Sequence, residues 1–214
     1  MKRRLVLAGW LVISLFASSS PAQTAPVSNK ALQRQLLNMD KEDQKYRLEQ
    51  MKLMSQVYGP GKEKAAARLK QITPRQEALD RKLIAELEAI IQRYGWPTVS
   101  MVGKKANNAA FLILQHADTK LQKKYFPLLK EAAAKKEANP ADAAMMEDRI
   151  LMADGKKQIY GTQLTINDQT KKWTVYQIED EQNVDARRAS VGLPPMAEYL
   201  KLFEENFGAP KKKK

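Results

Sequence analysis

The stretch from Ala109 to Leu114 constrains the fold more than any other part of the chain. It is apolar on nearly every side of a helix, which is typical of a helix buried at the centre of a domain. Upstream, apolar residues from Leu79 to Tyr94 recur at helical period and stop at Gly95, a residue that suits the left-handed conformation after a helix. Together these segments predict a mainly α-helical protein with the helix over residues 104–117 at its centre.

Further helices are indicated by capping residues and by breaks at glycine and proline. The stripe at 79–94 is expected to belong to a helix that starts at Thr73 and Pro74, because threonine caps helices and proline suits their first turn. Pro127 is expected to kink or restart the helix that contains it. The remaining helices are predicted over residues 30–57, 62–71, 140–153, 185–191 and 195–207, with one more that begins at Asp118 or Thr119. Asn139 is expected to cap the helix at 140–153.

One region has the pattern of a β-hairpin. Two segments, Gln158–Ile166 and Trp173–Ile178, flank a polar loop, and Gly161 lies inside the first of them. Gly161 then marks a bulge or a close backbone approach. Gln163 either points at a polar group or is an exposed amide at a bend. The expected fold is a single mainly α domain with one small β-hairpin near the C-terminal third.

The two ends of the chain differ from the rest. Three basic residues at positions 2–4 precede an apolar run over 5–17, and small residues follow as far as Ala22. This is the pattern of a signal peptide, and the run is too short for a bilayer core that needs about 20 residues. We expect cleavage after Ala22, an exported protein, periplasmic or secreted, and no transmembrane segment in the mature chain. The expected organisation is a flexible lead at 23–29, one helical domain at 30–207 with an extension at 30–72 and a core at 73–207, and a disordered basic tail at 208–214.

The formal charge of +13 says less about partners than its size suggests. The signal segment and the four terminal lysines hold seven of these charges, and elsewhere basic and acidic residues are interleaved. A terminal run of like charges is typically a solvated arm, and this one suits anionic phospholipid or cell-wall polymer. Basic and aromatic residues do not alternate as they do in nucleic-acid-binding segments, so no nucleic-acid partner is expected.

Missing residues and motifs exclude several chemistries. The chain has no Cys, which excludes disulfides, thiol catalysis and thiolate metal sites, and its single His excludes any site of two or more imidazoles. It has no Gly-x-Ser-x-Gly motif, and the glycines before Lys62 lack the spacing of a phosphate loop. We therefore expect no metal and no cofactor.

Arg149 is the most informative polar residue. On a helix over 140–153 it falls near the middle of the apolar face. An unpaired buried charge is strongly unfavourable, so the guanidinium needs a ligand anion or a carboxylate. In a purely structural role its partner is Asp118 or Asp148.

His116 is the second candidate. It lies at the C-terminal end of the central helix, where the helix dipole favours the protonated imidazole, and its ordinary pKa is near neutrality. It can act as a general base or a ligand donor, helped by nearby Asp118. It can equally cap the helix by bonding backbone carbonyls. Both interpretations stay open.

Several short blocks follow one another along the chain in a characteristic order: Asp43-Gln44 with Arg47, Gly95-Trp96-Pro97, Gln115-His116-Ala117-Asp118, Asp148-Arg149, Tyr160-Gly161-Thr162-Gln163, Ile178-Glu179-Asp180, Val184-Asp185, Arg187-Arg188 and Gly192-Leu193. In these blocks, which cover about Leu32 to Leu200, the chain resembles the bacterial domain-of-unknown-function family 6624. The resemblance implies no activity, cofactor or ligand. It implies that the hallmark positions are Trp96, His116, Asp118, Arg149, Tyr160 and Gln163.

Three functions are compatible with these positions. In the first, a polar pocket that includes His116, Asp118, Arg149 and Gln163 binds a small polar or anionic ligand or a cell-envelope partner. In the second, the protein is a hydrolase or lyase in which His116 is the general base, Asp118 orients it and Arg149 holds an anion. In the third, the same side chains only hold the hairpin to the helices.

In either functional case we expect the side chains of the central helix end and of the helix at 140–153 to converge. His116, Asp118 and Arg149 then meet, and Tyr160 and Gln163 of the hairpin close one side. Trp96 and Tyr160 are counted with the ligand-binding residues, and the large ring of Trp96 is expected to pack beneath the turn at residues 95–97.

Overall fold

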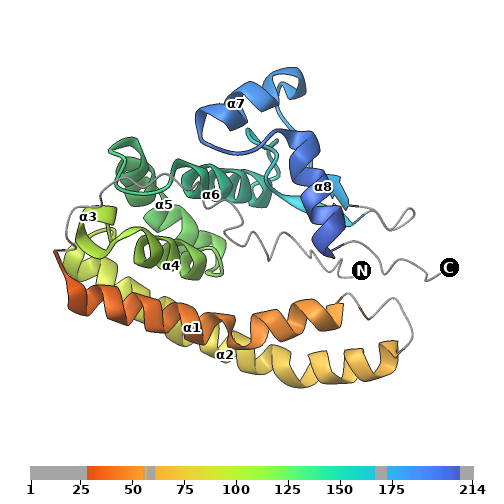
Figure 1. Ribbon diagram of the computed structural model, residues 1–214, viewed down its shortest axis with the longest axis horizontal. Helices are drawn as coiled ribbons and strands as arrows, with labels where there is room; N and C mark the ends of the chain where they lie inside the picture. The colour runs from red at the N-terminus through yellow and green to blue at the C-terminus, as the bar shows by residue number, and fades with distance from the viewer. Residues whose placement is uncertain (1–27, 55, 57–60, 167–172, 208–214) are drawn as a thin grey trace.

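The computed structural model describes residues 28–54, 56, 61–166 and 173–207 (Figure 1). Over these residues it has eight α-helices, one 3₁₀ turn and a two-stranded antiparallel sheet, which confirms the expected mainly α fold with a small hairpin. The predicted signal peptide, most of the lead and the lysine tail lie outside the described residues. The helices are α1 (Lys30–Met54), α2 (Lys62–Tyr94), α3 (Val99–Val102), α4 (Lys104–Leu114), α5 (Thr119–Ala134), α6 (Pro140–Ala153), η1 (Glu181–Asn183), α7 (Val184–Ser190) and α8 (Met196–Phe207).

α1 and α2 form a long helical hairpin along one side of the molecule (Figure 1). The predicted helix start at Thr73 is wrong, because α2 runs unbroken from Lys62 to Tyr94 with Pro74 inside it. Pro74 lies on the exposed side, whereas its neighbours Ile72 and Gln76 are buried. A proline removes one backbone hydrogen bond from a helix. Packing on α1 on both sides of Pro74 stabilises the continuous helix in spite of that loss.

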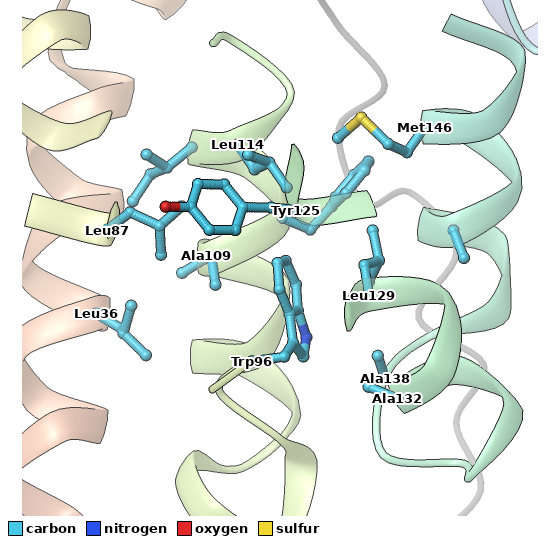
Figure 2. Packing of buried hydrophobic residues seen from close by; sticks show 14 of the residues in the cluster. Leu36, Leu87, Trp96, Ala109, Leu114, Tyr125, Leu129, Ala132, Ala138 and Met146 are labelled. Atoms are coloured by element: carbon cyan, nitrogen blue, oxygen red, sulfur yellow. The ribbon is translucent and has the colours of Figure 1, made fainter. Parts of the chain in front are cut away.

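α4 is the central helix, as its sequence predicts. It lies between the α1–α2 hairpin on one side and α5 and α6 on the other (Figures 1 and 2). Phe111 and Leu114 are 1% and 2% exposed, whereas Leu112 is only partly buried. Trp96 is 4% exposed and packs beside Leu129 of α5 (Figure 2), which confirms that it lies beneath the turn after α2.

α5 and α6 pack on each other and begin at the predicted caps. The side chain of Asp118 accepts the backbone N–H of Leu121 at 2.8 Å, and that of Asn139 accepts the N–H of Ala141 at 3.1 Å. α5 continues across Pro127 as one helix and does not restart there, since this proline lies on the exposed side. These caps set where α6 begins and hence where Asp148 and Arg149 lie on it.

The hairpin is shorter than its sequence pattern predicts. β1 (Leu164–Ile166) pairs antiparallel with β2 (Trp173–Val175), with Leu164 opposite Val175. The expectation that Gly161 lies inside a strand is wrong, because this glycine has a φ of 66° and precedes β1 in a loop. We call residues 158–163 the junction loop. The N–H groups of Ile159 and Thr162 bond to Asp148 of α6, and that of Gln163 bonds to the side chain of Gln158 within the loop, so they are not available for a strand ladder.

The last two helices, α7 and α8, lie beside the β-hairpin and complete the domain (Figure 1). Tyr199 and Phe203 lie one turn apart on α8 and pack edge to face, with ring centroids 5.0 Å apart. Both side chains join the main hydrophobic core. Of the helices that the structure describes, none is long and apolar enough to span a membrane.

Candidate functional site

The carboxylate of Asp148 on α6 holds the junction loop in place. This side chain is fully buried and accepts the backbone N–H groups of Ile159 at 2.7 Å and of Tyr160 at 3.0 Å. It also accepts the N–H and the hydroxyl of Thr162, each at 2.9 Å. Burial raises the pKa of Asp148, and the hydrogen bonds from these donors oppose the rise. Asp148, the residue before Arg149, therefore fixes the backbone of the junction loop.

The side chain of Gln158 closes the same loop from within. Its Oε1 accepts the backbone N–H of Gln163 at 2.7 Å, and its Nε2 donates to the carbonyls of Gln163 and Tyr176, each at 3.1 Å. One buried amide thus joins both ends of the junction loop to the segment after β2. Such a residue is architectural, because its bonds are all to backbone.

Two arginines of α7 hold the junction loop from outside. Arg187 donates from Nε to the carbonyl of Ile159 at 2.8 Å, and Arg188 donates from Nη1 to the carbonyl of Tyr160 at 2.7 Å. Arg188 is fully buried, and its guanidinium lies over the ring of Tyr199, 4.6 Å from the centroid. The Tyr199 hydroxyl in turn donates to the carbonyl of Thr162 at 2.8 Å.

Arg149 has surroundings different from those of Asp148. Burial lowers the pKa of Arg149 to about 10, and the neighbouring Tyr199 opposes this shift. The positive charge of Arg149 in turn lowers the pKa of His116. The charge of Arg149 thus acts on two groups from other parts of the fold, His116 after α4 and Tyr199 of α8.

His116 follows the last turn of α4 and is partly buried. The expectation that the helix dipole keeps it protonated is wrong, because burial and the charges of Arg47 and Arg149 lower its pKa well below 6.5. A helix end supplies only about half a negative charge, which two guanidinium groups and desolvation outweigh. The neutral imidazole has one N–H to donate and one nitrogen that accepts.

Gln163 brings an amide to the same place. It is 1% exposed, and its Nε2 donates to the Thr162 hydroxyl at 3.1 Å and to the carbonyl of Met145 at 3.5 Å. Its Oε1 is buried and has no hydrogen-bond partner among the described residues. Met145 is one helical turn before Arg149, so this bond brings the Gln163 amide to the backbone of α6 just before the arginine. We call His116, Arg149, Gln163 and Tyr199 the cationic site.

Three predicted site residues have other surroundings. Asp118 is exposed and uses its carboxylate to cap α5. Tyr160 packs against a small cluster that contains Ala144 and Leu193. Trp96 belongs to the main core, where its Nε1 is buried without a hydrogen-bond partner in the described part of the chain. Arg149 thus acts on His116, whereas Asp118 caps a helix and Tyr160 and Trp96 pack against apolar residues.

Sequence reasoning missed Tyr199. It also missed Arg47, whose charge acts on His116 from outside the cationic site. The signal for Tyr199 was weak, since an aromatic pair one turn apart on a terminal helix indicates only packing. Arg47 had a clearer one. It continues the buried stripe of α1 through Asp43, so that two charged residues occupy positions expected to be apolar.

The site suits an anion better than a metal ion. Over residues 28–54, 61–166 and 173–207, no group of three or more His, Cys, Asp or Glu side chains is arranged to hold a metal. A guanidinium and the N–H of a neutral imidazole are hydrogen-bond donors, which carboxylate and phosphate oxygens accept.

The fold and the site together define a mainly helical domain in which a loop fixed by a buried aspartate adjoins a cluster of donors. The chain belongs to the family of unknown function DUF6624, whose family model matches residues 30–212. This match confirms the resemblance seen in the sequence blocks. Neither the curated proteins nor the solved structures include a match to the chain.

Proposed function

We propose that the protein is a binding module that takes a small anionic ligand at the cationic site. What supports this proposal is that the charge of Arg149 on α6 acts on His116 after α4, although the two helices are separate in the sequence.

The chemistry of the three donors favours a carboxylate or a phosphate. A guanidinium binds such groups through two parallel N–H bonds, and charge-assisted bonds of this kind are about twice as strong as neutral ones. His116 adds a third donor without adding a charge. The unpartnered Oε1 of Gln163 is an acceptor, so it suits a protonated ligand oxygen such as the hydroxyl of hydrogen phosphate.

Binding accounts for the site better than catalysis does. A general base works best when its pKa is close to the working pH. The lowered pKa of His116 makes this imidazole a weak base at neutral pH. The hydrolase or lyase alternative therefore gains no support from the electrostatics around it.

The test is calorimetric titration of the mature protein with inorganic phosphate and with citrate at pH 7. We expect Arg149→Met to weaken binding of the better probe at least about tenfold, and Arg149→Lys to weaken it less, because a lysine keeps the charge but not the fork. Arg93→Met is the matched control, since Arg93 is an exposed arginine beside Tyr94 on α2. Equal affinity of Arg149→Met and wild type, or no binding by the wild type at millimolar concentrations of either probe, contradicts the proposal.

We also propose that the chain is exported and that the mature protein begins at Gln23. The basic start, the short apolar run and the small residues before Ala22 support this. N-terminal sequencing of the protein from the producing cell tests it. A chain that keeps Met1 contradicts cleavage.

A further inference from the structure

A buried guanidinium of α7 has hydrogen bonds to neutral groups only, within the residues that the structure describes. Arg188 is fully buried, and its Nε and Nη1 donate to the carbonyls of Pro194 at 2.6 Å and of Tyr160 at 2.7 Å. Its Nη2 is also buried and has no hydrogen-bond partner among these residues. A buried charge that bonds to carbonyls alone is unfavourable, so the Nη2 edge is suited to an anion.

A second unpartnered polar atom belongs to the same set of contacts. The Tyr199 ring, which packs against the Arg188 guanidinium, carries the hydroxyl that donates to the carbonyl of Thr162 at 2.8 Å. The Thr162 hydroxyl accepts Nε2 of Gln163 at 3.1 Å, while Oε1 of the same amide is buried and has no partner in the described part of the chain. A buried donor and a buried acceptor, both lacking a partner, are thus linked through Tyr199 and Thr162.

α8 covers this part of the junction loop. A Cβ at Gly161 would overlap the side chain of Met196, the first residue of α8, and Tyr199 one turn later reaches Thr162. The backbone N–H of Met196 donates to the carboxylate of Asp185 at 2.7 Å, which fastens the start of α8 to α7. α8 therefore lies directly over residues 161 and 162 and is anchored at its first turn.

The position of α8 reflects two opposing contributions. The rings of Tyr199 and Phe203 join the hydrophobic core and favour the closed position. The buried Nη2 of Arg188 and Oε1 of Gln163 oppose it, because a buried polar atom without a hydrogen bond is less stable than the same atom in water. Since Tyr199 packs on Arg188, movement of α8 away from the loop uncovers the guanidinium and allows solvent or a ligand to supply the missing bonds.

We propose that α8 is a lid, and that its opening presents Nη2 of Arg188 and Oε1 of Gln163 to a ligand that carries an anionic oxygen and a hydroxyl group, as hydrogen phosphate does. The guanidinium donates to the anionic oxygen, and the ligand hydroxyl donates to the amide oxygen. This inference rests on the proposed function, to which it adds a second arginine and a route of entry. Tyr199 is a positioning residue that holds the lid closed.

Hydrogen exchange of the mature protein, measured by mass spectrometry at pH 7, tests the lid without any ligand. We expect the backbone amides of residues 196–207 to exchange at least about tenfold faster than those of residues 104–114 in α4. Addition of 10 mM inorganic phosphate should accelerate exchange in α8 further, because the ligand selects the open form. Exchange in α8 as slow as in α4 overturns the lid, whether or not phosphate binds.

Tyr199→Phe is the main variant, because it removes the hydrogen bond to Thr162 and keeps the ring. By weakening the closed form it should tighten phosphate binding about threefold or more in calorimetric titration, since the apparent Kd falls as the open fraction rises. Tyr125→Phe is the matched control and should bind as the wild type does, because the Tyr125 hydroxyl also donates at 2.8 Å but to Glu88, away from α8. Fraying of α8 alone would not tighten binding. Affinity of Tyr199→Phe equal to or weaker than that of the wild type overturns the proposal.

Arg188→Lys distinguishes this inference from the proposed function. It keeps the charge and removes Nη2, so it should weaken phosphate binding at least about fivefold. A folded Arg188→Lys with wild-type affinity, together with weaker binding by Arg149→Met, overturns the role of Arg188 and leaves the cationic site standing. The opposite pattern contradicts the part given to Arg149 and supports Arg188 as the ligand's partner. If Arg188→Lys fails to fold, the Tyr199→Phe result decides alone.

Discussion

Asp148 accepts two hydrogen bonds from one residue, the backbone N–H and the side-chain hydroxyl of Thr162, through the same carboxylate oxygen at 2.9 Å each. A helix residue thereby defines the shape of a loop that follows it by little more than ten positions. The adjacent sequence blocks Asp148-Arg149 and Tyr160-Gly161-Thr162-Gln163 are therefore two halves of one structural unit.

Asp148→Asn should destabilise the protein by about 3 kcal/mol or more. An amide presents one acceptor where the carboxylate serves the N–H groups of Ile159, Tyr160 and Thr162, so buried donors lose their partner. Urea unfolding followed by circular dichroism measures the loss. Glu181→Gln, an isosteric change at an exposed position of η1, is the control. A loss below about 1 kcal/mol would show that the loop does not depend on this carboxylate.

Gly161→Ala should cost more than Gly192→Ala. Both glycines have positive φ, 66° and 76°, so both substitutions carry the same backbone strain. At Gly161 a Cβ also overlaps the side chains of Met196 and Ile178, whereas at Gly192 it meets nothing within 4 Å. We expect a difference of about 1–3 kcal/mol between the two variants in thermal or urea unfolding. Equal losses would mean that the side-chain ends of Met196 and Ile178 move aside at no cost.

Asp142 should make the protein less stable as the pH rises from about 4 to about 7. Burial raises its pKa from 3.8 to about 7 in the folded state, while hydrogen bonds from Asn108 and Asn139 oppose the rise. The folded chain thus keeps a proton that the unfolded chain has released over this interval, and the stabilisation from that proton is lost as pH approaches the folded-state pKa.

Asp142→Asn removes this titration. Relative to wild type, the variant should gain about 1–3 kcal/mol between pH 5 and pH 8 in urea unfolding. Asn108 can turn its amide to bond the new side chain. Parallel stability–pH curves for the two proteins would rule out a neutral Asp142 in the folded state.

Leu114→Ala should destabilise the domain by about 2–5 kcal/mol, and Leu112→Ala by clearly less. Leu114 is 2% exposed and belongs to the core around α4 (Figure 2), whereas Leu112 packs against that core and is only partly buried. Both variants remove the same atoms, so the difference in their free energies of unfolding measures how central each face of α4 is. A larger loss at Leu112 would show that Leu112, and not Leu114, lies on the more buried face of α4.

The sequence predicts the helices well where their signals are local. The caps at Asp118 and Asn139, the stop at Gly95 and the apolar run of α4 depend on neighbouring residues, and each agrees with the structure. The predicted helix start at Pro74 is wrong because it rests on a local preference of proline, whereas the helix is stabilised by contacts with residues distant in the sequence. Its first-turn preference is weaker than the packing of α2 on α1 along both halves of the helix.

The candidate site was harder to predict, since its members meet only through the tertiary fold. Arg149 was recognisable from its place on an apolar helix face. Nothing local indicates that Tyr199 of α8 comes beside it, or that Arg47 acts on His116. The junction loop has the sequence pattern of a strand. Its N–H groups are instead accepted by the carboxylate of Asp148 on α6, which the local pattern does not indicate.

A buried ion pair between Arg47 of α1 and Asp80 of α2 sets the register in which these two helices pack. The leucines at their interface resemble one another in shape, so a slide of one helical repeat exchanges one leucine contact for another. The same slide separates Arg47 from Asp80 and strands buried charges, which costs about 3–5 kcal/mol. Leucine contacts hold the two helices together, while the ion pair of Arg47 with Asp80 permits only one register of the helical hairpin.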